Sequence, residues 1–179
     1  MAKDVQSLTS DAEYDRRMQR APTAYEIFLD MDGVIADFDV HAVGKRDENG
    51  APLWDTLDFA WWSTMPAFDG MKDFHAALLQ FGNVRFLSSP SLSPDCFQGK
   101  AVWIQSHFGK WALRDLILCR AQDKCLLARP HHILIDDRES NITQWVQAGG
   151  IGILHTGDMT ATLKTVEALV APTSASLAV

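Results

Sequence analysis

Two aspartates, Asp30 and Asp32, stand one residue apart directly after the short apolar run 27–29. The run is β-branched and aromatic, which predicts a buried strand. A carboxylate at the end of a buried strand is costly unless something pairs with it, and two so close together favour a bound cation. Ligands bind at the carboxyl ends of strands in open α/β sheets, so this stretch predicts a functional site.

Further polar side chains follow later apolar runs in the same way. They are Ser88 and Ser89 after residues 84–87, Lys124 a little after residues 116–118, and Asp136 and Asp137 after residues 133–135. If these runs form one parallel sheet, their carboxyl ends lie at one edge and the side chains meet there. This convergence predicts the site more strongly than any single motif does.

The segments between these strands have the apolar spacing of helices. The expected helices cover residues 69–81, 94–108, 141–148 and 160–170, and a fifth strand covers residues 151–154. Strands that alternate with helices at this spacing predict an α/β fold, with a parallel sheet covered by helices on both faces. A chain of 179 residues is expected to form one such domain, here residues 25–179.

Two segments fall outside this alternation. Residues 1–24 are polar and charged, and are expected either to form a short helix that ends before Pro22 or to be a frayed extension. Residues 40–68 are rich in aromatic side chains and contain a turn at residues 47–50. This stretch is too long for a simple connection and too short for a domain.

The composition limits the classes of partner. The net charge of −7 argues against a broad nucleic-acid-binding surface, which needs a basic footprint. No apolar stretch approaches the roughly 20 residues that span a bilayer, and no secretory signal is visible, so no membrane contact is expected. Three cysteines without CxxC spacing indicate reduced thiols in a cytoplasmic protein.

The strand-end residues also carry a resemblance. The sequence DMDG at 30–33 resembles the first motif of the haloacid dehalogenase (HAD) superfamily of phosphohydrolases, and Ser88, Lys124 and the pair 136–137 follow in the order of its other three motifs. The longer runs DMDGVIADF and LIDDR are similar to the pyrimidine 5'(3')-deoxyribonucleotidases within it. The resemblance implies a HAD-like Rossmannoid three-layer sandwich, with residues 40–68 as a small cap insertion.

The resemblance also implies a phosphatase chemistry for the carboxylates. Asp30 would attack phosphorus and form an aspartyl-phosphate, and Asp32 would protonate the leaving alcohol and later deprotonate water. Mg²⁺ would bind Asp30, the backbone carbonyl of Asp32 and one of Asp136 and Asp137, with Asp137 favoured. HAD dehalogenases lack the second aspartate of the first motif, so Asp32 favours phosphate ester hydrolysis.

Further residues are assigned to the substrate by the same resemblance. Ser88, Ser89, Lys100 and Lys124 would hold the phosphate. Phe38, Trp61 and Trp62 match positions where deoxyribonucleotidases place aromatic rings, which would stack on a nucleobase. The expected cap is shorter than is usual in that family, so it does not fix the base or the sugar.

Each part has a simpler structural explanation. Asp32 with Gly33 could form a turn, the two serines could connect a strand to a helix, and the pair 136–137 could cap the next helix. Lys100 and Lys124 could be solvated surface charges, and Phe38, Trp61 and Trp62 could be the core of the cap. The joint pattern favours a Mg²⁺-dependent phosphatase for a nucleoside monophosphate. The alternatives are a phosphatase for another small phosphoester or a nucleic-acid end, and a non-catalytic nucleotide-binding protein. The oligomeric state stays open, a homodimer included.

Overall fold

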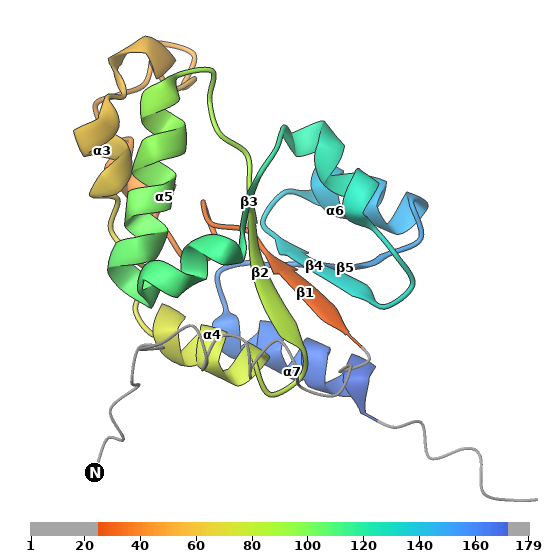
Figure 1. The fold of residues 1–179 in the computed structure, drawn as a ribbon. Helices are drawn as coiled ribbons and strands as arrows, with labels where there is room; N and C mark the ends of the chain where they lie inside the picture. Colours follow the sequence, from red (N-terminus) through yellow and green to blue (C-terminus); the bar gives the residue numbers. More distant parts are fainter. Residues whose placement is uncertain (1–24, 172–179) are drawn as a thin grey trace, which may run out of the picture.

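A computed structural model describes residues 25–171, and a five-stranded parallel sheet forms its centre (Figure 1). The strand order is β3-β2-β1-β4-β5, and every neighbouring pair is parallel. The strands are β1 (Glu26–Leu29), β2 (Asn83–Ser88), β3 (Leu116–Leu118), β4 (His132–Asp136) and β5 (Ile151–Leu154). The predicted α/β fold is therefore confirmed, with strand ends that differ from expectation by one residue at most.

The strands are apolar on both faces because both faces are covered. Ile27 and Leu29 of β1 point into the larger core cluster, whereas Phe28 between them belongs to a second cluster with Leu134 and Trp145. Successive side chains of a strand point to opposite faces, so a doubly covered sheet needs consecutive apolar residues. This explains why the run 27–29 shows no polar alternation.

Helices form a layer on each side of the sheet. On one side, α4 (Met71–Leu78) packs against α7 (Met159–Val170), and on the other, α6 (Glu139–Gln147) packs against the 3-10 helix η3 (Ala121–Leu127). The long helix α5 (Pro94–Phe108) begins at Ser93, whose hydroxyl accepts a hydrogen bond from the Asp95 N–H. A serine cap followed by proline is a favourable helix start, as the sequence predicts.

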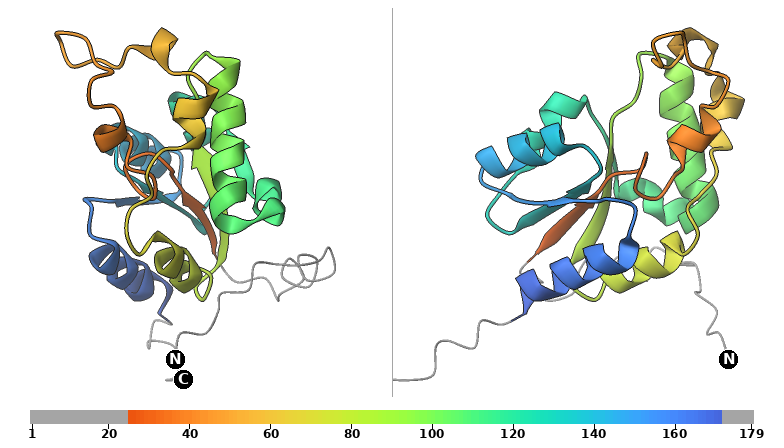
Figure 2. Two further views of the ribbon diagram at one scale, coloured as in Figure 1. Left: turned by 90° about the vertical axis from the view of Figure 1, so that its left-hand side faces the viewer. Right: turned by 180° about the vertical axis from the view of Figure 1, so that it is seen from behind.

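The aromatic-rich segment stands beyond the carboxyl edge of the sheet, alongside α5 (Figure 2). The short helix α2 (Phe38–His41) leads into it, and it contains the 3-10 helix η1 (Trp54–Thr56) and the short helix α3 (Phe59–Ser63), none of which the sequence predicted. The expected turn at residues 47–50 closes a short antiparallel pairing between Arg46 and Pro52.

A close contact seats α3 on α5. A Cβ at Gly99 would lie 2.2 Å from the Cβ of Trp62, so only glycine permits this approach. The Trp62 indole N–H donates to the Leu57 carbonyl, and that of Trp103 on α5 donates to the Met65 carbonyl at 2.7 Å. The segment is thus held to α5 by backbone proximity and by the buried Trp103 hydrogen bond, whereas the Trp62 hydrogen bond lies within the segment.

Some sequence expectations lie beyond the part that the structure describes. The predicted helix in residues 1–24 is outside residues 25–171. Across those described residues, no helix has the length and apolarity needed to cross a bilayer. The three cysteines, Cys96, Cys119 and Cys125, are all free thiols.

Candidate active site

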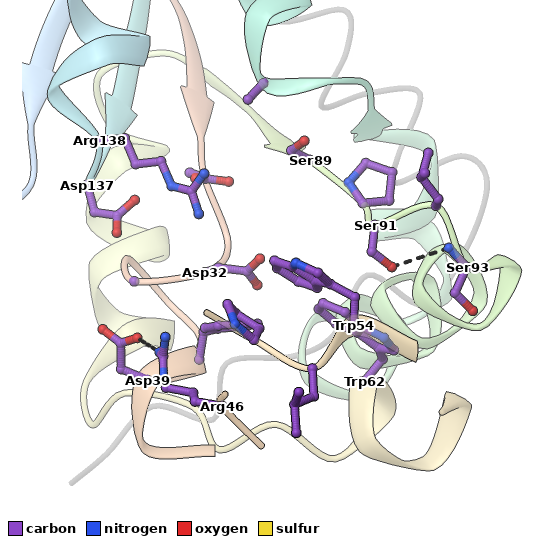
Figure 3. Close-up of a pocket in the computed structure, with 18 of the residues that line it drawn as sticks. Asp32, Asp39, Arg46, Trp54, Trp62, Ser89, Ser91, Ser93, Asp137 and Arg138 are labelled. Atoms are coloured by element: carbon purple, nitrogen blue, oxygen red, sulfur yellow. Dashed lines mark hydrogen bonds and ion pairs between the residues drawn. The ribbon is translucent and has the colours of Figure 1, made fainter. Parts of the chain in front are cut away.

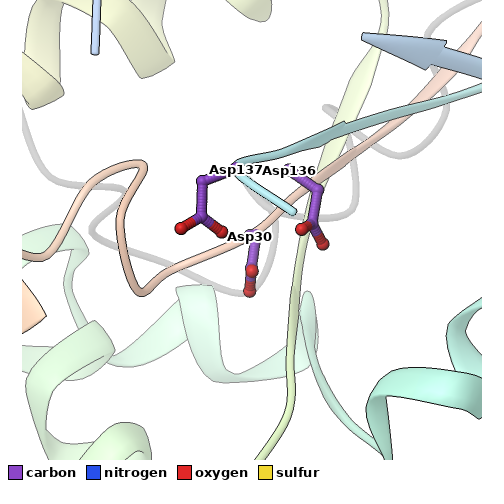
Figure 4. A group of neighbouring side chains, drawn as sticks. All are labelled: Asp30, Asp136 and Asp137. Carbon is purple, nitrogen blue, oxygen red and sulfur yellow. The ribbon is translucent and has the colours of Figure 1, made fainter. Parts of the chain in front are cut away.

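Three carboxylates meet where β1 and β4 end, at the centre of the sheet. Asp30 follows β1, Asp136 ends β4, and Asp137 follows it. Each offers a carboxylate oxygen within 4.8 Å of the others (Figure 4). In the order β3-β2-β1-β4-β5 the chain runs outward in opposite directions from these two strands, and ligands bind at such a switch point.

A buried ammonium joins two of the carboxylates. Lys124 Nζ lies 3.0 Å from Asp30 Oδ2 and 2.6 Å from Asp136 Oδ2, and the lysine is 1 % exposed. Burial alone would lower the pKa of Lys124, but the two carboxylates outweigh it and raise the pKa above its ordinary value. The side chain therefore stays charged at the base of the site. The helix η3, which was not predicted, brings it there.

Both carboxylate oxygens of Asp136 accept hydrogen bonds from groups of this chain. Its Oδ1 accepts hydrogen bonds from the Arg138 backbone N–H and the Asn141 amide, both at 2.9 Å. Its Oδ2 accepts from Lys124 and, at 3.0 Å, again from Asn141. The side chain is fully buried, so Asp136 serves to fix its neighbours.

Asp137 is the carboxylate that faces open space. It is exposed and lines the cleft, and the loop after β1 comes very close to it. A Cβ at Gly33 would lie 2.3 Å from Asp137 Oδ2, and Gly33 has a φ of +75°, so glycine is needed for both reasons. Although much of the residue is exposed, its carboxyl is partly buried, and this burial, then the charges of Asp30 and Asp136, raise the pKa of Asp137 to about 6.

The donor set fits a hard divalent cation. Three carboxylates face one ammonium, that of Lys124, which leaves two negative charges uncompensated. After burial, the charges of Asp30 and Asp136 are the next causes that raise the pKa of Asp137. Mg²⁺ prefers oxygen ligands and is usually held by few carboxylates together with phosphate and water. Asp30 and Asp137 are the carboxylates open to it. The backbone carbonyl of Asp32 stays a predicted ligand.

Asp32 projects into the cleft from the loop after β1 (Figure 3). The N–H groups of Val34, Ile35 and Ala36 all donate to the Met31 carbonyl, which folds the loop tightly. The apolar side chains of the loop are fully buried beneath it. Asp32 Oδ2 accepts a hydrogen bond from Lys100 at 2.6 Å. The acidic side chain is therefore held on a tight turn at the edge of the cleft.

The two serines after β2 face different ways. Ser88 is fully buried, and its hydroxyl accepts a hydrogen bond from Lys100 at 3.0 Å. Ser89 lines the cleft, across from the aspartates (Figure 3). Lys100 itself is fully buried, as Lys124 nearly is, so the alternative explanation of solvated surface charges is wrong for both.

The predicted aromatic residues are placed differently from one another. Phe38 lines the cleft, whereas Trp61 packs on Phe38 and His41 and is absent from the cleft lining. Trp62 reaches the cleft wall, but only 1 % of it is exposed. The sequence did not single out Trp54, which lines the cleft and is 45 % exposed. The sequence hint for Trp54 was its position a few residues after the predicted turn at residues 47–50.

The cleft between the sheet edge and the aromatic segment has a volume of about 940 Å³. Asp30, Asp32, Lys124 and Asp137 line it from the sheet edge, and Phe38 and Trp54 line it from the aromatic side. Asp32, Asp137 and Trp54 are labelled in Figure 3. Small-molecule sites have volumes of about 300 to 1,000 Å³. The space is thus large enough for a phosphoester with a sizeable organic group.

Known proteins resemble this chain in sequence and in fold. A Bordetella bronchiseptica protein named "Putative 5'(3')-deoxyribonucleotidase" is 32% identical over a 140-residue alignment that covers 63% of this chain and 73% of the relative. A Bordetella pertussis protein of the same name matches with the same identity and coverage. No protein-family model matches the sequence.

A solved structure shares the fold at low sequence identity. The haloacid dehalogenase-like family hydrolase from Xanthomonas campestris superposes with a TM-score of 0.58 and is 12% identical. The match covers 86% of this chain and 94% of that one. The chain thus has the fold of the HAD-like hydrolases, and with the Bordetella relatives it falls in the class of phosphomonoester hydrolases. Within that class, the chain belongs to the family of the 5'(3')-deoxyribonucleotidase-like proteins.

Proposed function

We propose that this enzyme hydrolyses a nucleoside monophosphate with the help of Mg²⁺ and through an aspartyl-phosphate on Asp30. One observation carries the proposal: Asp30 lies beside the Lys124 ammonium and beside the open carboxylate of Asp137, at the base of a cleft with an exposed tryptophan. Residues 40–68, which supply that tryptophan, act as a small cap over the site.

The proposed first half-reaction transfers the phosphoryl group to the enzyme. A carboxylate oxygen of Asp30 forms a bond to phosphorus while the bond from phosphorus to the ester oxygen breaks. Asp32 donates a proton to that oxygen, so the product leaves as an alcohol. Lys124 reduces the repulsion between the Asp30 carboxylate and the anionic phosphate. Ser89, on the cleft wall, holds a phosphate oxygen.

The second half-reaction returns the enzyme to its starting state. Asp32, now a carboxylate, takes a proton from a water molecule as its oxygen attacks phosphorus, and the bond to Asp30 breaks. Inorganic phosphate leaves. Mg²⁺, held by Asp30 and Asp137, would supply positive charge that neutralises the phosphate during both transfers. Asp136 keeps Lys124 in place through the 2.6 Å ion pair.

Aromatic side chains support a nucleotide as the substrate. Trp54 and Phe38 line the cleft with ring centroids 6.1 Å apart, so a flat base could lie against either ring. Base stacking on an aromatic ring contributes about 1 to 3 kcal/mol. The relatives are named for deoxyribonucleotides, which fits this wall of the cleft.

Acidic side chains disfavour a polynucleotide. A second cavity of about 390 Å³ adjoins the cleft at Trp54 and is lined by Asp55, Asp58 and Asp95, with no basic side chain among its lining residues. A strand that continued beyond the terminal nucleotide in this direction would meet like charges.

The test is a phosphate-release screen with purified protein, with Mg²⁺ or with a chelator. Its substrates are deoxy- and ribonucleoside monophosphates, sugar phosphates and 5'- or 3'-phosphorylated oligonucleotides. We expect Mg²⁺-dependent release from mononucleotides, fastest with pyrimidine deoxyribonucleotides. Release from oligonucleotide ends alone, or tight nucleotide binding without any turnover, would refute the proposal.

Removal of the exposed indole is expected to weaken substrate binding. Trp54→Ala should raise KM for a mononucleotide by about 10-fold, and by no more than about 100-fold, because one stacking surface is lost. The kcat should change little, since Trp54 lies on the wall opposite the aspartates. The measurement is initial rate against nucleotide concentration. Trp111→Ala, at a tryptophan that does not line the cleft, is the matched control, and an unchanged KM in Trp54→Ala would contradict the stacking role.

The pH dependence of Mg²⁺ binding follows from the pKa of Asp137. Since this carboxyl has a pKa of about 6 in the folded state and an ordinary value of 3.8, the metal-free fold loses stability as pH rises through this range. Mg²⁺ binds the ionised form, so it reverses that loss. We expect saturating Mg²⁺ to raise Tm clearly at about pH 7.5 and little at about pH 5. Calorimetry measures the shift, and Asp137→Asn should abolish it at both pH values.

A further inference from the structure

A second buried ammonium lies behind the cleft. Lys100 on α5 is 0 % exposed and is not among the residues that line the cleft. Its Nζ donates to Asp32 Oδ2 at 2.6 Å and to the Ser88 hydroxyl at 3.0 Å. Both acceptors belong to this chain, so two of the three N–H donors of the ammonium are already used.

The remaining side of this ammonium faces an aromatic ring. Lys100 Nζ lies over the Trp62 ring, 5.2 Å from its centroid, which is a favourable cation–π contact. Carboxylate, hydroxyl and indole together enclose the charge. Because the side chain is fully buried and two of its donors are taken, Lys100 is poorly placed to hold a phosphate in the cleft, unlike a lysine that reaches into the open space.

Asp32 in turn depends on Lys100. Its Oδ1 has no hydrogen-bond partner within residues 25–171, and its Oδ2 is bound by Lys100. The ion pair is mostly removed from water, since the side chain of Lys100 is 0% and that of Asp32 23% exposed. A buried ion pair has a more fixed geometry than a surface pair, and removal of one partner leaves the other as an uncompensated charge.

We propose that Lys100 is a positioning residue, which orients the Asp32 carboxyl for proton transfer and does not bind the phosphate. The inference rests on the proposed function, in which Asp32 protonates the leaving alcohol. The sequence suggested that Lys100 contacts the phosphate, and the proposal gives this lysine a different role. It also links the cap to the proton donor, because Trp62 of α3 covers Lys100 and packs on the adjacent Gly99.

The test uses two substrates that differ in their need for a proton donor. A deoxyribonucleoside monophosphate releases an alcohol that must be protonated, whereas p-nitrophenyl phosphate releases a stable phenolate. For Lys100→Met we expect kcat/KM for the nucleotide to fall by about 100-fold, and that for p-nitrophenyl phosphate to fall by less than about threefold. Inhibition by inorganic phosphate should stay within about twofold of wild type, because no phosphate contact is lost.

The variants are chosen so that each outcome either supports or contradicts the proposed role of Lys100. Lys100→Gln keeps an N–H donor toward Asp32 and should recover part of the nucleotide activity, and it replaces Lys100→Met if that variant does not fold in a thermal melt. Lys164→Met, an exposed change on α7, is the matched control.

Equal losses on both substrates with at least about 10-fold weaker phosphate inhibition would make Lys100 a phosphate ligand and overturn the proposal. No loss on either substrate would also overturn it. A wild-type enzyme that hydrolyses neither substrate would instead refute the proposed function, and the inference with it.

Discussion

Asp30→Asn is expected to abolish turnover, with kcat lowered by at least about 10⁴-fold, the scale seen when a catalytic nucleophile is removed. The amide has nearly the same shape but is not a nucleophile toward phosphorus. The variant loses the charge of the 3.0 Å ion pair between Asp30 and Lys124 but keeps the ion pair between Lys124 and Asp136. Tm should therefore change by only a few degrees. Phosphate release and a thermal melt on the same preparation measure both effects.

A matched control separates chemistry from charge. Asp73→Asn removes one carboxylate from the exposed first turn of α4, away from the cleft, and should leave kcat unchanged. If Asp30→Asn retained the wild-type rate, Asp30 would not be the nucleophile. If it lost activity only because it unfolded, the thermal melt would show this directly.

The second large effect concerns stability. Lys124→Met removes the ammonium between Asp30 and Asp136 and leaves two buried carboxylates facing each other. Removal of one partner of a buried ion pair costs about 3 to 5 kcal/mol, which corresponds to a fall in Tm of about 10 °C in a domain of this size. Turnover should fall as well, because the nucleophile loses its nearest positive charge.

Low pH provides the diagnostic for this variant. The repulsion between the two carboxylates disappears when one takes up a proton, so the difference in Tm from wild type should shrink as the pH is lowered. Lys72→Met, an exposed change on α4, is the control and should show no such trend. A Lys124→Met protein as stable as wild type at neutral pH would contradict the central position of this lysine.

The sheet was predictable because its strands are buried on both faces. Runs such as 27–29 and 133–135 are apolar at every position, and such short runs between helical segments indicate a parallel sheet. The parallel arrangement then brings the residues after each strand to one edge. For this reason Asp30, Lys124 and Asp136 could be placed together from the sequence alone, although Asp30 and Asp136 are more than one hundred residues apart.

The cleft wall could not be predicted because it depends on how the aromatic segment packs. Trp61 and Trp62 are adjacent, yet the contact of α3 with Gly99 buries Trp62 and leaves the exposed surface to Trp54. The same holds for Lys100. A lysine on a helix usually reaches solvent, and only the approach of Asp32 and Ser88 explains its complete burial.

The most direct measurement of the central claim is to trap the phosphoryl-enzyme. The Asp32→Asn protein lacks the group that activates water, so a substrate with a good leaving group should load the enzyme faster than water can unload it. After an acid quench and proteolysis, mass spectrometry should find one phosphoryl group on the peptide that contains Asp30, and none when Mg²⁺ is chelated. Turnover by the wild-type protein with no phosphorylated Asp30 in the trapped variant, or a phosphoryl group on another residue, would contradict the account.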